Sequence, residues 1–538
     1  MWFPVLAVTS LARLACGEDQ WWRDAVYYRI LVDSLKTAMA TDWEISTISY
    51  SRALGADAVI LSPLSEMSSD CSKPGVTNLT NIDERYGNLG AITQLLDKTR
   101  KLELKALISL PVQTISTASD WCKSSADKVN GFENTLIWED GSADNVPPVM
   151  DGIEAWVWNV DRSAYFATRK NEAILNLCSE SVAAYLASAQ CAWIRRGFLG
   201  ILLNPDFVVD TRCGVKLLQK LVAEAISCAR SSGLDTPVIL VETTFSPQES
   251  AVYYSDGGVG AHSVLSAALA APTKRAAAQI AIAFHEALLN APQDSAPTWI
   301  TSAPYESRIA TRYGNDNVDG INLLALILPG AAVIQQGDEL GVADTILEWA
   351  SQTPKCWPYP AVPSSAPFPW SAAENGGFTD GEPWLPLSPN YRYANAKTEF
   401  GNNNSHIGVL RIAAAMRKSP AMGPHMEIKR IGDTIAILRW GGLGSLLVVV
   451  NLGQTQGEMK LSAIYGLPSE VTVAVSSAGS GLSTGSHIAV DKTLKLAPGE
   501  ALLLAGGPRH CGGPGPVDKI ANKLSEGWQK INKYFSNI

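Results

Sequence analysis

Short apolar runs alternate with longer helical stretches along most of the chain, and this alternation limits the fold more than any other feature of the sequence. The apolar runs lie at residues 58–63, 106–110, 199–203, 238–241, 298–300 and 332–335, and helical patterns lie at 92–102, 180–196, 215–230 and 276–289. Strands that alternate with helices of this length indicate βαβ units and a parallel sheet. Because the units continue over about 380 residues, we expect an α/β fold with a closed (β/α)8 TIM barrel.

The chain of 538 residues is too long for one core, and two changes of pattern divide it. After the third apolar run the sequence becomes polar and rich in Trp, Asn, Asp and Gly, which indicates an inserted domain. From Met426 onward, short strands separated by turn residues predict a C-terminal antiparallel β-sandwich. The predicted domains are a signal peptide at 1–17, the barrel (domain A) at 21–110 and 170–400, domain B at 111–169, a connecting helix at 401–425, the sandwich (domain C) at 426–507, and a Pro/Gly linker with an amphipathic helix at 508–538.

The first residues predict a secretory signal peptide. An apolar run of about a dozen residues, broken by Arg13, ends in the small residues Ala15, Cys16 and Gly17, which is the length of a signal-peptide core rather than of a membrane span. A truncated membrane anchor and a mis-assigned start are the alternatives. We therefore expect a secreted, extracellular protein, with the cell surface as the alternative.

The last residues predict an amphipathic helix. Its apolar positions recur at steps of three and four, and lysines lie between them. The apolar face either packs on its own protein or contacts a membrane surface or a partner protein. The apolar positions are Val517, Ile520, Leu524, Trp528, Ile531, Phe535 and Ile538.

Composition excludes some functions and supports secretion. The net charge of -9 gives no electrostatic basis for binding nucleic acid, and no window of 18 uncharged apolar residues predicts a membrane span. Nine cysteines leave eight after removal of the signal peptide, and this even number fits disulfides in an oxidising compartment. Two sequons predict glycosylation at Asn78 and Asn403. No spacing of His or Cys indicates a metal site, and we expect no cofactor.

The stretch GFLGILLNPDF, residues 197–207, reads as a buried parallel strand that ends at a loop. In enzymes built on parallel strands, this end is where a catalytic carboxylate would lie. The position holds the amide Asn204 instead, with Asp206 and Asp210 farther along the chain.

A series of motifs in fixed order gives the chain a likeness to a known family. The motifs are WWRDAVYYRI from Trp21, LGADAVILSPL from Leu54, NIDERYGNL from Asn81, AWVWNVDRSAYF from Ala155, VETTFS from Val241, YYSDGGVGAH from Tyr253, SRIATRYG from Ser307, LPGAAVIQQGDELG from Leu328, GFTDGEPWLPLSPNYRYAN from Gly377 and LAPGEALLL from Leu496. Together they resemble the α-glucosidase (maltase) branch of the α-amylase superfamily of glycoside hydrolases, over roughly residues 21–505. The resemblance implies a (β/α)8 barrel, an inserted B domain after strand three and a C-terminal β-sandwich.

The resemblance also assigns family roles to positions of this chain. Family members use a carboxylate nucleophile and a carboxylic acid, and the resemblance places Asn204 at the nucleophile position and Glu242 at the acid position. A third Asp, an Arg, and a strand-three Asp and His complete the family site. In this chain Tyr305 stands for the third Asp, Leu202 for the Arg, and Ser109 and Thr114 for the Asp and His. The family's calcium loop is missing, so we expect no structural calcium.

The replaced positions predict a catalytically degenerate protein. An amide does not replace a carboxylate nucleophile, and rescue by Asp206 would need about 6–7 Å of displacement along a strand. We expect a secreted pseudoenzyme that binds an unknown protein or glycan. One alternative is a heavy chain of an amino-acid transporter, since those subunits also resemble α-glucosidases. The other alternative is a residual α-glucosidase that acts on maltose- or sucrose-type α-glucosides, with Glu242 and Asp206 as the only nominated pair.

Overall fold

A computed structural model gives the fold of most of the chain. It describes residues 20–35, 43–150, 152–204, 211–243, 245–254, 259–292, 295–304, 306–350, 362–441, 443–464 and 467–507. The predicted signal peptide and C-terminal helix lie outside these residues, as do Asp206, Asp210 and Tyr305. Within the described ranges, no helix has the length and apolar character needed to cross a membrane.

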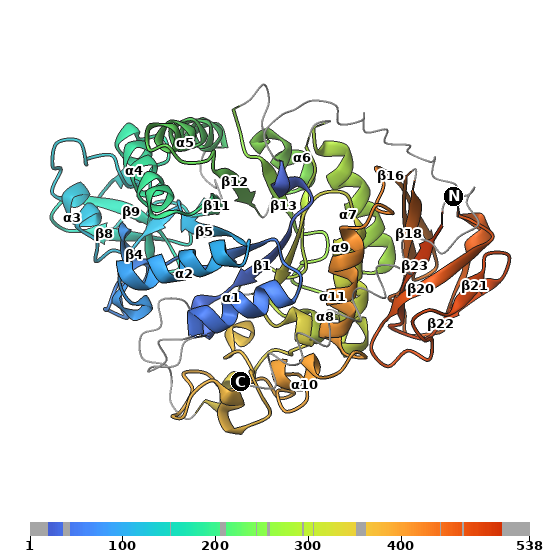
Figure 1. Cartoon of the computed structure of the whole chain (residues 1–538). Helices are drawn as coiled ribbons and strands as arrows, with labels where there is room; N and C mark the ends of the chain where they lie inside the picture. Colours follow the sequence, from blue (N-terminus) through green and yellow to red (C-terminus); the bar gives the residue numbers. More distant parts are fainter. Residues whose placement is uncertain are drawn as a thin grey trace. The chain divides into compact units, whose positions relative to one another are not determined.

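Eight parallel strands form a closed barrel, which confirms the predicted fold class (Figure 1). Around the barrel the strands are β1 (Val26–Ile30), β15 (Ala332–Gln335), β14 (Thr298–Ile300), β13 (Ser263–Ser266), β12 (Val238–Glu242), β11 (Gly200–Asn204), β5 (Lys105–Pro111) and β2 (Ala58–Leu61). The sequence pattern identified six of them and missed β1 and β13. Val, Ile and Leu dominate most of these strands because helices cover a parallel sheet and leave its strands buried.

The chain divides into two compact units. The first comprises Met1–Asp57, Ser266–Ala350 and Val362–Ile538, and the second comprises Ala58–Leu265 and Ser351–Ala361. The helices of the first unit are α1 (Trp43–Ala53), α7 (Ala277–Asn290), α8 (Ile309–Tyr313), α9 (Val318–Ile327), α10 (Ala396–Phe400) and α11 (His406–Arg417). Those of the second unit are α2 (Leu89–Lys101), α3 (Asp120–Ala126), α4 (Glu180–Arg196), α5 (Thr211–Ser231) and α6 (Pro247–Ser250).

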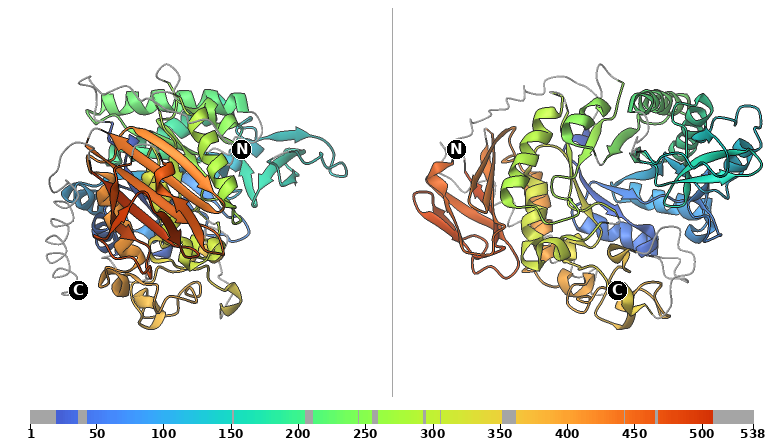
Figure 2. Two further views of the ribbon diagram at one scale, coloured as in Figure 1. Left: turned by 90° about the vertical axis from the view of Figure 1, so that its right-hand side faces the viewer. Right: turned by 180° about the vertical axis from the view of Figure 1, so that it is seen from behind.

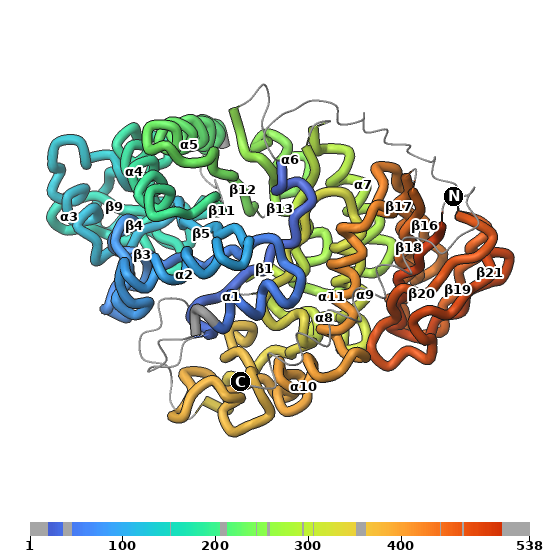
Figure 3. Tube along the Cα trace, in the orientation of Figure 1, coloured from blue at the N-terminus to red at the C-terminus, as the bar shows by residue number. Residues whose placement is uncertain are grey.

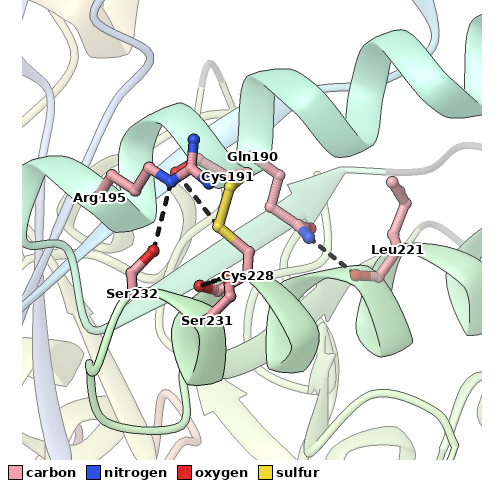
Figure 4. Close-up of a disulfide and its surroundings, with 7 residues drawn as sticks. All are labelled: Gln190, Cys191, Arg195, Leu221, Cys228, Ser231 and Ser232. Carbon is pink, nitrogen blue, oxygen red and sulfur yellow. Dashed lines mark hydrogen bonds between the residues drawn. A yellow bond between two sulfur atoms is a disulfide. The ribbon is translucent and has the colours of Figure 1, made fainter.

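In the second unit, α4 and α5 pack side by side (Figure 1). β11 lies between these two helices in the sequence. Gly197 ends α4 with φ 111°, a left-handed conformation that side chains disfavour. Cys178, just before α4, is disulfide-bonded to Cys213 in α5, and Cys191 of α4 is bonded to Cys228 of α5. Figure 4 shows the second disulfide beside the amide of Gln190, which donates to the carbonyl of Leu221 at 2.8 Å.

The insertion between β5 and α4 forms its own small sheet. Its strands are β6 (Thr114–Ile115), β10 (Glu172–Ile174), β9 (Ala164–Arg169) and β7 (Trp138–Asp140) in that order, and β8 (Ala155–Asn159) pairs with β9. Ile153, Trp156, Tyr165, Ala167 and Ile174 form the core of this sheet. A separate hairpin, β3 (Ser65–Met67) with β4 (Val76–Ile82), precedes α2.

The C-terminal part of the first unit is antiparallel (Figure 2, left). Its six-stranded sheet runs β16 (His425–Ile431), β17 (Thr434–Gly441), β18 (Gly444–Asn451), β23 (Ala501–Gly506), β20 (Glu470–Ser476) and β21 (His487–Ala489). A second sheet pairs β19 (Gly457–Lys460) with β22 (Thr493–Leu496). Met459 and Leu496 of the small sheet share a buried core with Leu447 and Leu502 of the large one, which is the arrangement of a sandwich.

Buried ionisable groups lie between the helices of the first unit, where α9 and α11 run side by side (Figure 3). Glu339 accepts hydrogen bonds from the hydroxyls of Tyr28 and Tyr50 at 2.8 and 2.7 Å. Burial raises the pKa of Glu339 to about 7 although these hydrogen bonds act in the opposite direction. Burial likewise raises the pKa of Glu399, whose carboxylate accepts from the backbone of Ile407, to about 8.

His406 begins α11 and forms an ion pair with Asp319 of α9, with 2.8 Å between Nδ1 and Oδ1. Burial alone would lower the pKa of His406, but its hydrogen bond to Asp319 and the nearby carboxylates of Asp319, Glu399 and Asp316 together raise it to about 9. All three shifts therefore favour proton binding by the folded state.

These shifts predict that stability falls as pH rises. Glu339, Glu399 and His406 hold protons in the folded protein at pH values where the unfolded chain releases them. Their contribution is complete below the unfolded pKa values of 4.5 for the glutamates and 6.5 for His406, and is lost as pH rises from there to about 9. The melting temperature should fall over that range, and Glu399→Gln should flatten the decline. Thermal melts of wild type and variant, with exposed Glu374→Gln as control, measure the effect. A melting temperature that rises across this range contradicts it.

The disulfides between α4 and α5 predict a second effect on stability. They close loops with sequence separations of 35 and 37 residues, and crosslinks of this length each stabilise a protein by about 3–4 kcal/mol in the loop-entropy description. Replacing Cys191 and Cys228 together by Ala should lower the free energy of unfolding by about 2–4 kcal/mol. Denaturant titration checks this value. An unchanged unfolding midpoint would exclude a stabilising role for this crosslink.

Candidate active site

Four neighbouring strands of the second unit bring the candidate residues to one edge of the barrel. In the parallel register of β5, β11, β12 and β13, Asn204 pairs with Pro111, and Glu242 pairs with Leu265. Side chains two residues apart lie on the same face of a strand, so Asn204 and Leu202 share one face of β11. The register also aligns Leu202 with Leu240, two residues before Glu242, and so places Asn204 and Glu242 at the same level.

Asn204 and Glu242 are in contact. The Nδ2 atom of Asn204 donates to Oε2 of Glu242 at 3.3 Å; Asn204 is exposed and Glu242 is half-buried. The carboxyl of Glu242 can give or take a proton at the barrel rim, which is the role of a general acid. The amide of Asn204 can donate and accept hydrogen bonds but cannot take up a proton or attack a sugar carbon at neutral pH.

The level below this pair carries no charge. It consists of Ser109, Leu202, Leu240 and Ser263, which pair across the four strands, and Leu202 is 1% exposed. Gly200, at the start of β11, has no space for a larger residue, since a Cβ would lie 2.6 Å from the carbonyl of Val238. The close approach of β11 to its neighbours therefore depends on this glycine. Leu202, at the position where the family resemblance implies an arginine, is part of the packed interior.

Thr114 lies on the inserted sheet. Its hydroxyl donates to Oε2 of Glu172 at 2.5 Å, across the β6–β10 pair. Burial raises the pKa of Glu172, while the hydrogen bond from Thr114 acts to lower it. The sequence alone did not identify Glu172 as a candidate, because its partner Thr114 is 58 residues away and no local sequence pattern predicts their contact.

A pocket of about 250 Å³ lies where the insertion meets the chain around the Cys178–Cys213 disulfide. Its wall begins at Gln113, two residues after Pro111, the register partner of Asn204. Amide groups, a guanidinium and the disulfide lie among its apolar walls. The lining residues are Gln113, Thr114, Asn134, Leu136, Ile137, Trp138, Gly152, Arg169, Ile174, Leu175, Asn176, Leu177, Cys178 and Cys213. No local sequence pattern predicts this pocket, since it joins segments up to 100 residues apart.

The remaining candidates occupy separate places. Nδ1 of His262 accepts a hydrogen bond from the backbone of Ile239, and burial lowers the pKa of His262 to about 4, so the ring is neutral. Asn78 lies in β4 and accepts from the hydroxyl of Thr80, while Asn403 is exposed before α11. Glycosylation of both stays a prediction. No cluster of His, Cys, Asp and Glu suited to a metal ion occurs in the part of the chain that the structure describes.

Comparisons of the sequence and of the structure with known proteins all point to one family. The family described as alpha amylase, catalytic domain, matches residues 39–208 and 261–423, which is more than half of the chain. Maltase A1 of Drosophila melanogaster is 22% identical over 542 residues, covering 88% of this chain and 94% of the maltase. The salivary alpha-glucosidase of Aedes aegypti is 22% identical and covers 93% of this chain and 97% of its own length. The structure of trehalose-6-phosphate hydrolase from Bacillus licheniformis shares the fold with a TM-score of 0.76, at 19% identity, covering 90% of this chain and 99% of that chain.

These relatives overturn the expectation of a pseudoenzyme. The interpretation as a non-catalytic binding protein, and the statement that the chain is not an enzyme, are wrong because full-length relatives are a maltase and an alpha-glucosidase. The expectation took the replaced positions as evidence of lost activity, although Glu242 keeps a carboxyl group at the end of β12. The relation to transporter heavy chains stays a prediction that these comparisons do not test. The chain belongs to the α-amylase family and is maltase-like within it.

Proposed function

We propose that the protein is an α-glucosidase-type glycoside hydrolase that cleaves maltose- or sucrose-type α-glucosides. The observation that carries the proposal is the carboxyl of Glu242 at the end of β12, 3.3 Å from Asn204 at the end of β11. The names of the maltase and alpha-glucosidase relatives support the same substrate class.

Glu242 acts as the general acid in this proposal. In its protonated form it gives its proton to the glycosidic oxygen while the bond between that oxygen and the anomeric carbon breaks. A water molecule then attacks the anomeric carbon from the opposite face and releases its proton to solvent, and Glu242 takes up a proton from solvent before the next turnover. General acid catalysis of this kind accelerates a reaction by about 10²–10⁴-fold.

Asn204 makes this hydrolysis slow. Its carbonyl can accept a hydrogen bond from the attacking water or from a sugar hydroxyl, which helps to orient either group. The amide forms no covalent bond to the sugar, so water is the attacking group at this position. Leu202 supplies no positive charge below the pair, and the developing charges are less stabilised than with a guanidinium there.

Secretion belongs to the same proposal. Residues 1–17 read as a signal peptide, and the two disulfides that join α4 and α5 are typical of proteins that fold in an oxidising compartment. The salivary alpha-glucosidase relative supports an extracellular location. Finding Glu18 or a nearby residue at the N-terminus of protein recovered from culture medium would test this.

The first prediction from the proposed function concerns Glu242. Purified wild-type protein should hydrolyse maltose, sucrose or an aryl α-glucoside slowly, and Glu242→Gln should lower kcat at least about 100-fold because glutamine cannot donate the proton. Glu224→Gln, an exposed change on α5, is the matched control and should leave the rate unchanged. A wild type that releases no glucose from all three substrates would defeat the proposal.

The second prediction concerns Asn204 and the stereochemistry of the product. Direct attack by water inverts the anomeric configuration, so the wild type should release β-glucose, which proton NMR distinguishes from α-glucose. Asn204→Asp restores a carboxylate beside Glu242, and should raise turnover by about tenfold or more and release α-glucose. Release of α-glucose by the wild type would instead indicate a carboxylate nucleophile, with Asp206 as the first to replace.

A further inference from the structure

The inserted sheet ends in an unpaired edge. β8 pairs with β9 along one side, and its other side makes no backbone hydrogen bond to any residue within the described ranges. β8 is labelled beside β9 in Figure 1. Such an edge presents free N–H and C=O groups that can pair with another strand.

The edge lacks the features that usually prevent an edge strand from pairing with a strand of another molecule. Its sequence, Ala155-Trp156-Val157-Trp158-Asn159, contains no charge and no proline, and its register with β9 runs without a bulge. The charged residues Glu154 and Asp161 lie only beyond its ends.

Exposed apolar side chains are frequent in the sequence on both sides of this strand. Five of the sixteen large apolar side chains that are exposed in the described residues fall within fifteen consecutive positions, which makes this stretch the densest on the chain. They are Val146 (61% exposed), Val149 (61%), Met150 (52%), Val157 (42%) and Val160 (76%). This density of exposed apolar residues next to an unpaired strand is consistent with a contact site.

The sequence of the edge is nearly symmetric about Val157. If two copies pair antiparallel with Val157 at the centre, Trp156 of each copy lies opposite Trp158 of the other, and Ala155 lies opposite Asn159. Aromatic pairs across strands stabilise a sheet. Glu154 lies opposite Val160, so no like charges meet. The tryptophans also extend a core that already exists, since Trp156 belongs to the core of the inserted sheet and Trp158 packs against it.

We propose that two copies of this chain associate through β8, with Val157 at the two-fold axis, to form one continuous sheet from the two insertions. A five-residue strand with its flanking side chains is smaller than the about 1,200–2,000 Å² of a stable protein interface. The dimer is therefore concentration-dependent, with a dissociation constant on the order of micromolar. Neither Asn204 nor Glu242 takes part, so the dimer is independent of the proposed hydrolase activity.

The test is sedimentation velocity of the full-length protein from about 1 to about 100 µM. Wild type should shift from monomer to dimer over this range. Val157→Lys and Val157→Asp should each stay monomeric, because like charges meet at the axis, and a 1:1 mixture of the two should recover the dimer. Val252→Lys, which changes another exposed valine of the same unit (51% against 42% for Val157), should dimerise as wild type does. Melting temperatures close to wild type show that the variants are folded.

A crosslink tests the register. Val157→Cys places two cysteines opposite each other with Cα atoms about 4.5–5.5 Å apart, within the range of a disulfide. Val160→Cys is the control, because its two copies would lie about 20 Å apart along the strands. Oxidation should crosslink only the first variant. Wild type that stays monomeric throughout, a Val157→Lys variant that still dimerises, or equal crosslinking of both cysteine variants would each overturn the proposal.

Discussion

The in-register parallel pairing of β5, β11, β12 and β13 determines which side chains meet at the barrel edge. Because the strands align Leu202 with Leu240, the next residues on the same face of each strand, Asn204 and Glu242, lie side by side. A slip of one residue would exchange the two faces of β11 and bury the polar group. Gly200 allows β11 to lie this close to β5 and β12, since the neighbouring strands leave no space for a Cβ at this position. The chemistry of the site is therefore a consequence of backbone pairing more than of the individual side chains.

The sequence predicted the barrel because apolar runs and amphipathic helices repeat with the right lengths, and α4 begins and ends where the pattern placed it. It missed β1 and β13 for local reasons. Val26–Ile30 reads VYYRI and includes a buried arginine, and Ser263–Ser266 carries a serine at each end. Neither run is apolar enough to stand out, although the barrel buries both.

For the site, the sequence supplied the residues but not their contacts. Asn204 and Glu242 were identified from motif order, and the structure brings them to 3.3 Å. Glu172 and the pocket lined by Gln113 could not be predicted, because they depend on the pairing of β6 with β10, which lie more than fifty residues apart in the chain. The inference of a lost activity failed for a related reason. Motif positions show which groups are replaced, whereas activity depends also on the groups that stay, here the carboxyl group of Glu242.

The two disulfides between α4 and α5 have a topological consequence. Cys178 and Cys191 lie before β11 in the chain, and their partners Cys213 and Cys228 lie after it. A protease that cuts once anywhere between Cys191 and Cys213 therefore cannot release either fragment, because two covalent bridges span the break. The nicked protein would migrate as one band without reductant and as two bands with it. The two disulfides therefore keep the segments on either side of β11, the strand that carries Asn204, covalently joined after such a cut, which the strand pairing of the barrel alone cannot do.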